Sequence, residues 1–222
     1  MKKLLILLLV LCLFGCNVQQ NTEEPTNNET PKVVELPTKE NPNSTIMSES
    51  PITPLNIDNY MFRDDCVYLD TRSPKQFYME GSIAGFINLP FYEYIADFNV
   101  NVEALFAIKK IKNGEDIIYP GDPGSFVANY EESEDLIYDL IPMDKNLLII
   151  ATAGVESCYL MNLLIQLGYD PAKMYNVGSF TTGMGSEVAY RSYSEAKYLV
   201  PPFELYDTNI TYDWTSLTPI KK

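Results

Sequence analysis

Short apolar runs alternate with amphipathic segments between residues 57 and 188, and this alternation predicts strands and helices in turn. The run at residues 147–150 is apolar at every position, as expected of a central parallel strand that is buried on both faces. Three further runs are short and rich in β-favouring residues. The predicted strands are residues 66–69, 86–89, 147–150 and 174–177.

The segments between these strands have the spacing and end signals of helices. Ser73 is a good N-cap and Pro74 fits the first helical position, so a helix that turns Phe77 inward begins there and stops near Gly81. A helix at residues 157–167 carries no charged side chain and ends at Gly168. Apolar spacing also predicts helices at residues 102–111 and 131–141, whereas three glycines and two prolines make residues 112–128 a loop.

Strands that alternate with helices imply an α/β domain with a parallel central sheet and helices on both faces. The acidic side chains at residues 131–135 suit the start of a helix, because the helix dipole favours negative charge there. A calcium site is the alternative interpretation of this acidic cluster.

The ends of the chain differ from this domain in composition. Residues 17–53 are poor in aromatics and rich in Asn, Thr, Glu, Ser and Pro, so we expect residues 16–56 to be a flexible tether. The domain then spans residues 57–188, with an extra segment at about 102–129. Residues 189–222 form a C-terminal extension whose aromatic side chains are expected to pack on the domain.

The first fifteen residues have the pattern of a secretory signal. Lys2 and Lys3 precede an apolar run at residues 4–14, which is too short to span a membrane, and Gly15-Cys16 follows. This ending resembles the lipobox of bacterial lipoproteins, in which the cysteine is lipidated and becomes the first mature residue. The resemblance implies a signal peptide at residues 1–15, a lipid on Cys16, and attachment to the extracytoplasmic side of a bacterial cell membrane. An ordinary cleaved signal or a buried apolar helix is the alternative.

The composition of the chain argues against several classes of ligand and catalytic group. The chain has 30 acidic and 16 basic side chains and a net charge of −14, which disfavours binding to nucleic acid. It has no histidine, which removes the commonest general base and the commonest metal ligand. No cysteines have zinc-ligand spacing, and only Cys66 and Cys158 would remain as thiols after processing. We therefore expect neither a metal nor a cofactor.

Two stretches resemble the halves of a rhodanese domain. The first contains Val-Tyr-Leu-Asp-Thr-Arg-Ser-Pro at residues 67–74, followed by Gly81, Ile83, Gly85 and Asn-Leu-Pro at residues 88–90. The second contains the strand at residues 148–150, a loop, a helix, Gly168-Tyr169 and Tyr-Asn-Val at residues 175–177. The resemblance covers residues 66–185 and implies a rhodanese-like three-layer domain.

Rhodanese domains that transfer sulfur hold a catalytic cysteine at the start of a loop before a helix, where backbone amides stabilise an anion. In this chain the cysteine position holds Ala151, the usual arginine is Glu156, and the usual histidine after Gly81 is Ser82. Thr152 has no histidine to activate it as a substitute nucleophile. The loop comprises Ala151, Thr152, Ala153, Gly154, Val155, Glu156 and Ser157.

The resemblance also assigns supporting roles. Asp70 and Arg72 match the family's Asp-x-Arg, which orders the loop by hydrogen bonds and an ion pair, so a structural role is favoured over a catalytic one. These features predict a catalytically inactive, membrane-anchored binding or scaffolding domain, whose partner is an envelope protein or a small anion. The alternatives are an atypical sulfurtransferase or thiol-redox protein that uses Cys158, and a solute-binding lipoprotein. Cys66 is expected in the core, and helical spacing with Met161 also favours burial of Cys158.

Overall fold

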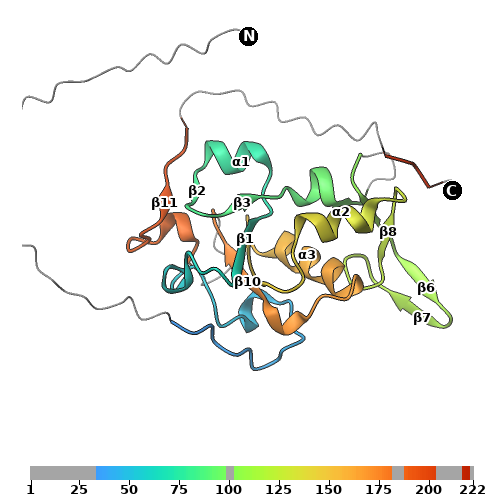
Figure 1. Ribbon diagram of the computed structural model, residues 1–222, viewed down its shortest axis with the longest axis horizontal. Coiled ribbons are helices and arrows are strands. Elements are labelled where there is room, and N and C mark those ends of the chain that lie inside the picture. The colour runs from blue at the N-terminus through green and yellow to red at the C-terminus, as the bar shows by residue number, and fades with distance from the viewer. Residues whose placement is uncertain (1–33, 99–102, 182–187, 204–216, 221–222) are drawn as a thin grey trace, which may run out of the picture. The chain divides into compact units, whose positions relative to one another are not determined.

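A four-stranded parallel sheet lies at the centre of the computed structural model, which describes residues 34–98, 103–181, 188–203 and 217–220 (Figure 1). The strand order is β10-β9-β1-β3. These strands are β10 (Met174–Ser179), β9 (Asn146–Ala151), β1 (Cys66–Asp70) and β3 (Ile87–Asn88). The mixed α/β class and the parallel sheet predicted from the sequence are confirmed.

The register brings the carboxyl ends of these strands together. Asp70 of β1 pairs with Ile150 of β9 and with Asn88 of β3, and Ala151 pairs with Ser179 of β10. Polar or loop-forming residues that follow these strands therefore meet at one edge of the sheet, which is the usual place for a site in a parallel sheet.

Alternate residues of β9 enter two separate hydrophobic cores. Leu147 and Ile149 pack into one core with α3 (Val155–Gln166) and α2 (Ser133–Leu140), which cover that face of the sheet. Leu148 and Ile150 pack into the other core, with residues from both ends of the described chain. This second face is covered by extended chain and by short 3₁₀ turns, η2 (Ile57–Tyr60) and η5 (Tyr190–Ser192), while α1 (Pro74–Met79) follows β1.

The start of α1 forms as its sequence predicts. The Ser73 side chain accepts a hydrogen bond from the backbone N–H of Gln76, and the Gln76 side chain accepts one from the backbone N–H of Ser73. Pro74 occupies the first helical position. This reciprocal capping box satisfies two helix-end donors and fixes the direction in which the chain leaves β1.

The domain begins earlier than the sequence predicts. Residues 34–56 were expected to belong to a tether, but Ile52 is fully buried in the second core, and η1 (Met47–Glu49) contacts β10. The Lys39 ammonium group, on a side chain only 5% exposed, donates to the carbonyls of Pro42, Ser44, Pro171 and Met174. A composition-based prediction missed this segment because a few buried residues and backbone groups, rather than an apolar run, hold it to the sheet.

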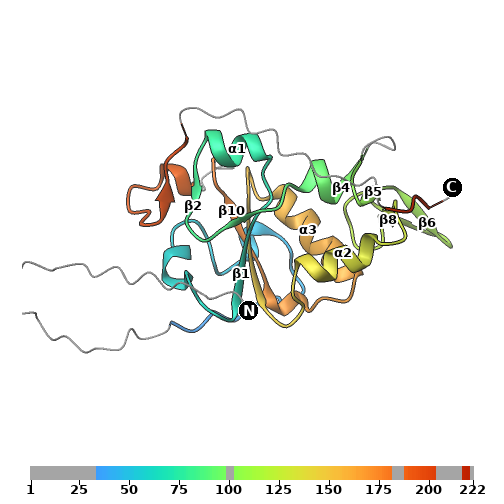
Figure 2. The ribbon, with the colours of Figure 1, turned by 45° about the horizontal axis from the view of Figure 1, so that its top comes forward.

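The extra segment is also wrongly predicted. Instead of a helix at residues 102–111 and a loop at 112–128, the structure has β4 (Ala96–Asp97), β5 (Phe106–Ile108) and β8 (Phe126–Ala128) in one small sheet. A second hairpin, β6 (Ile111–Asn113) and β7 (Asp116–Ile118), projects from the side of the molecule (Figures 1 and 2). The prediction failed because a short apolar run is compatible with both the helical and the strand period. The strand β5 is buried at every position, so it shows no alternation of apolar and polar residues.

The C-terminal extension packs on the domain over residues 188–203, as predicted. Tyr190 is fully buried, and β11 (Leu199–Val200) pairs antiparallel with β2 (Ser82–Ile83). The signal peptide, Cys16 and residues 204–216 of the C-terminal extension lie outside the described residues. Within the described ranges, no helix is both long and apolar enough to cross a membrane.

Replacing Lys39 by methionine should lower the free energy of unfolding by about 2–3 kcal/mol, because several buried carbonyls lose their donor. Urea titration followed by circular dichroism measures this. Lys173→Met is the matched control, since Lys173 donates to a single exposed carbonyl, that of Asp144, and its loss should cost less than about 0.5 kcal/mol. Equal losses in the two variants would contradict a special role for Lys39.

Candidate functional site

The loop between β9 and α3 lies at the carboxyl edge of the sheet. Ala151 is the last residue of β9 and is fully buried, and its carbonyl accepts a hydrogen bond from the Phe180 N–H at 2.8 Å. The helix begins at Val155, two residues before the predicted start at Ser157. Gly154 caps it with φ of +79°, and a Cβ there would lie 2.7 Å from the Met47 sulfur. The loop can therefore make this close approach only with glycine at position 154.

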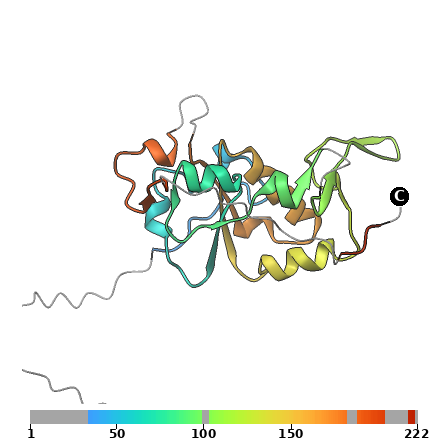
Figure 3. The ribbon, with the colours of Figure 1, turned by 90° about the horizontal axis from the view of Figure 1, so that it is seen from above.

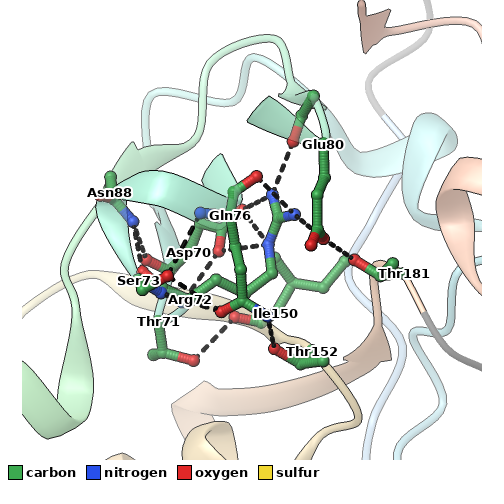
Figure 4. A network of polar contacts seen from close by, with 11 residues as sticks. Asp70, Thr71, Arg72, Ser73, Gln76, Glu80, Asn88, Ile150, Thr152 and Thr181 are labelled. Atoms are coloured by element: carbon green, nitrogen blue, oxygen red, sulfur yellow. Dashed lines mark hydrogen bonds and ion pairs between the residues drawn. The ribbon is translucent and has the colours of Figure 1, made fainter. Parts of the chain in front are cut away.

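Arg72 is the centre of the polar network beside this loop (Figure 4). Its Nη2 lies 2.6 Å from Asp70 Oδ2, and both side chains are completely excluded from solvent. Nη2 also donates to the Gly81 carbonyl at 2.8 Å, and the guanidinium lies 3.7 Å from the centre of the Phe180 ring. The Glu80 carboxylate lies 3.7 Å from Nη1. These contacts give the buried cation two carboxylates, a carbonyl and an aromatic face.

The same network reaches the loop itself. Thr71 donates both its backbone N–H and its hydroxyl to the Ile150 carbonyl, at 2.9 and 3.0 Å. Gln76 on α1 donates its amide to the Thr152 hydroxyl at 3.1 Å, and Asn88 donates to the carbonyls of Asp70 and Arg72. Burial raises the pKa of Asp70, and the hydrogen bonds and charge of Arg72 act in the opposite direction. Asp70 and Arg72 therefore contact the elements that frame the loop.

The N-terminal segment covers the other side of the loop. Asn176 on β10 donates its side-chain amide to the carbonyls of Gly154 and Thr45, at 2.9 and 3.0 Å. The Ser157 side chain is fully buried, and its hydroxyl has no hydrogen-bond partner among the residues that the structure describes. The loop is thus held by residues that precede residue 57, which the sequence prediction had excluded from the domain.

Cys158 lies in the first turn of α3 and is half-buried. Its Sγ is 3.3 Å from the Thr45 hydroxyl and 3.8 Å from the Asn162 amide nitrogen. Burial raises its pKa, so the thiol is protonated at neutral pH. Cys66 is buried, and the pKa of its thiol is raised to about 11, chiefly by burial. Neither thiol has the lowered pKa of a reactive cysteine.

Glu156, at the position where the rhodanese resemblance leads us to expect an arginine, is half-buried at the start of α3. Burial raises its pKa, the charge of Asp70 adds to this effect, and a hydrogen bond from its own backbone N–H opposes it. No ion pair joins Glu156 to any residue in the described part of the chain. The Glu156 carboxylate lies at the positive end of the helix. There it accepts a hydrogen bond from a backbone N–H that an anionic ligand would otherwise use.

Aromatic side chains beside Glu156 were not predicted as part of the site. Tyr92 lies on the single π-helical turn η3 (Phe91–Ile95), and burial, together with the charge of Glu156, raises its pKa to about 12. The Phe98 ring lies 6.2 Å from that of Tyr92 and 6.0 Å from that of Tyr159 on α3. The aromatic residues after Pro90 were the available signal, but sequence reasoning placed no element there.

The loop and the acidic side chains of the chain have these chemical properties. Where the rhodanese resemblance leads us to expect a nucleophile, the structure has only the buried methyl group of Ala151, and no group of three or more Cys, Asp or Glu side chains in the described ranges could hold a metal ion. The acidic cluster at residues 131–135 forms the start of α2, as predicted, and Glu132 accepts a hydrogen bond from the Thr218 N–H at 3.0 Å. The chain matches no protein-family model and no curated protein.

Glu156→Gln should make the protein more stable than the wild type at neutral pH. Between the ordinary carboxyl value of 4.5 and the raised pKa of Glu156, the native state binds more protons than the unfolded state, so wild-type stability falls as pH rises through this interval. Gln cannot ionise, so the difference in free energy of unfolding between the variant and the wild type should grow from pH 4 upward. Urea midpoints over this range test this, with Glu134→Gln on α2 as the control for lost charge. An advantage that does not change with pH would contradict the prediction.

Proposed function

We propose that this chain is a lipid-anchored, rhodanese-like domain without sulfurtransferase activity, which binds a partner at the extracytoplasmic face of a bacterial membrane. The proposal rests first on Ala151, because a buried methyl group occupies the position where the family has its nucleophile. The motif order, the parallel sheet and the loop before α3 support the family resemblance. The ending Gly15-Cys16 supports the lipid anchor.

Electrostatics support the same conclusion. Sulfur transfer from thiosulfate requires a thiolate and a site that attracts an anion. At a separation of 4 Å and an effective dielectric near 20, a carboxylate repels an anion by about 4 kcal/mol, where an arginine would attract it by a similar amount. Glu156 therefore opposes the anionic donors that a sulfurtransferase uses.

Thiol chemistry at Cys158 has less support. Burial raises the pKa of Cys158 and disfavours a thiolate at neutral pH, and the opposing hydrogen bond from the Thr45 hydroxyl does not reverse this shift. A solute-binding role would require the extra segment to cover a pocket, and its strands instead form a small sheet and a projecting hairpin. The binding or scaffolding function therefore agrees best with the site.

The purified protein should show no thiosulfate:cyanide sulfurtransferase activity above a no-enzyme control. A double variant, Ala151→Cys with Glu156→Arg, restores the thiol and the cation, and it should acquire measurable thiocyanate formation. Ala151→Cys alone should remain poor, because Glu156 still opposes the donor. Wild-type turnover that disappears in Cys158→Ser would overturn the proposal and assign the activity to that thiol.

Cys16→Ser should abolish lipidation in a bacterial host. Metabolic labelling with a radioactive fatty acid, followed by gel electrophoresis, should detect the wild type and not the variant. Cys12→Ser is the matched control, since Cys12 lies inside the apolar run and its loss should leave labelling intact. Labelling of the Cys16 variant would refute the lipid anchor while leaving the proposed absence of sulfur transfer unaffected.

A further inference from the structure

The outer side of the loop combines a carboxylate with several aromatic rings. Glu156 and Tyr159 are three residues apart on α3, so their side chains are neighbours on one face of the helix. The turn η3, which carries Tyr92, packs against α3 (Figure 3). Phe98 stands between the two tyrosines, edge-on to Tyr159 at 6.0 Å and tilted to Tyr92 at 6.2 Å. Two separate elements thus bring aromatic side chains to the first turns of α3, where Glu156 lies close enough for its charge to act on Tyr92.

The local charge is negative and not neutralised. Arg72 is the cation of the adjacent network, and it is shared between the carboxylates of Asp70 and Glu80. Glu156 adds a further carboxylate, and none of the ion pairs formed by described residues includes it. Its own backbone N–H and the positive end of α3 offset only part of the cost of burying this carboxylate, so a bound cation would stabilise it further.

The exposed surface at this point is apolar and aromatic. Phe98 is 46% exposed and Val155 is 43% exposed, while Tyr92 and Tyr159 are half-buried. The faces of aromatic rings carry negative partial charge, so they attract an organic cation within about 6 Å and also contact its hydrocarbon stem. An inorganic anion gains nothing from such surroundings.

We propose that the site formed by Glu156, Tyr92, Phe98 and Tyr159 binds an organic cation, namely an alkylammonium or alkylguanidinium group. This ligand class deepens the proposed binding function, on which it rests, and replaces the small anion expected from the family's loop. The ammonium or guanidinium pairs with the Glu156 carboxylate, and its stem lies against Phe98 and Val155. The group can belong to a free amine or to a lysine or arginine side chain of a protein partner.

Calorimetric titration of the full chain in a neutral detergent tests this ligand class. The probes are n-butylammonium, ethylguanidinium, a short peptide that contains lysine and arginine, and sodium thiosulfate as the anion. We expect saturable binding of the cations and none of thiosulfate. Tighter binding of the peptide than of the free amines would identify a protein side chain as the source, whereas equal binding would identify a small amine.

Variants identify the residues involved. Glu156→Gln should weaken cation binding by about tenfold or more, because a charge-assisted contact is lost. Phe98→Leu should weaken it by about threefold, since it keeps an apolar side chain but removes the ring. Glu134→Gln, on the exposed first turn of α2, is the control for general attraction to an acidic protein and should bind as the wild type does.

Three outcomes would overturn the proposal: no binding of any cation, binding of thiosulfate instead, or equal weakening by Glu156→Gln and Glu134→Gln. If Glu156→Gln fails to fold, as judged by circular dichroism, the Phe98→Leu titration carries the test. Each of these failures leaves the proposed absence of catalysis intact, because that proposal fails only if the wild-type protein transfers sulfur.

Discussion

The buried ion pair between Asp70 and Arg72 is the interaction on which the site depends. Removal of one partner from such a pair leaves an uncompensated charge and costs about 3–5 kcal/mol. The Arg72 guanidinium contacts Asp70 at the end of β1, the carbonyl of Gly81 and the ring of Phe180. Because the buried charge needs these contacts, it fixes the relative positions of the three segments. The carboxyl edge of the sheet is consequently well ordered although Ala151 has no reactive atom. In the proposed function, this order serves recognition: it holds the loop and the start of α3 in a constant shape.

The sequence predicts the elements that carry strong local signals. The central strand is apolar at every position, Ser73 and Pro74 mark the start of α1, and Gly168 marks the end of α3. Each of these signals depends on the backbone preferences of one short segment, so it needs no knowledge of the rest of the fold. The Asp70–Arg72 pair could be named in advance for another reason: residues 67–74 resemble the rhodanese Asp-x-Arg motif, which implies an ion pair, and the structure has this pair.

The parts that sequence reasoning missed depend on distant contacts. The segment around Lys39 looks like a tether because its composition is polar, yet its order comes from carbonyls more than a hundred residues away, at Pro171 and Met174. The run at β5 fits a helical period as well as a strand, and only its pairing with β4 and β8 decides between them. The surroundings of Glu156 likewise depend on Tyr92 and Phe98, which lie in a stretch after Pro90 for which no element was predicted.

If the chain is anchored to a membrane as proposed, the early start of the folded domain limits the distance between the domain and that membrane. Under the proposed attachment at Cys16, only residues 17–33 separate the lipid from Val34, where the described structure begins. Fully extended, that length of chain reaches about 60 Å, whereas a tether that continued to residue 56 would reach about 140 Å. By holding the segment around it against the sheet, Lys39 removes more than half of this reach. A partner of this protein would therefore have to be present within a few nanometres of the lipid surface, in a thin layer in which the tethered domain is highly concentrated.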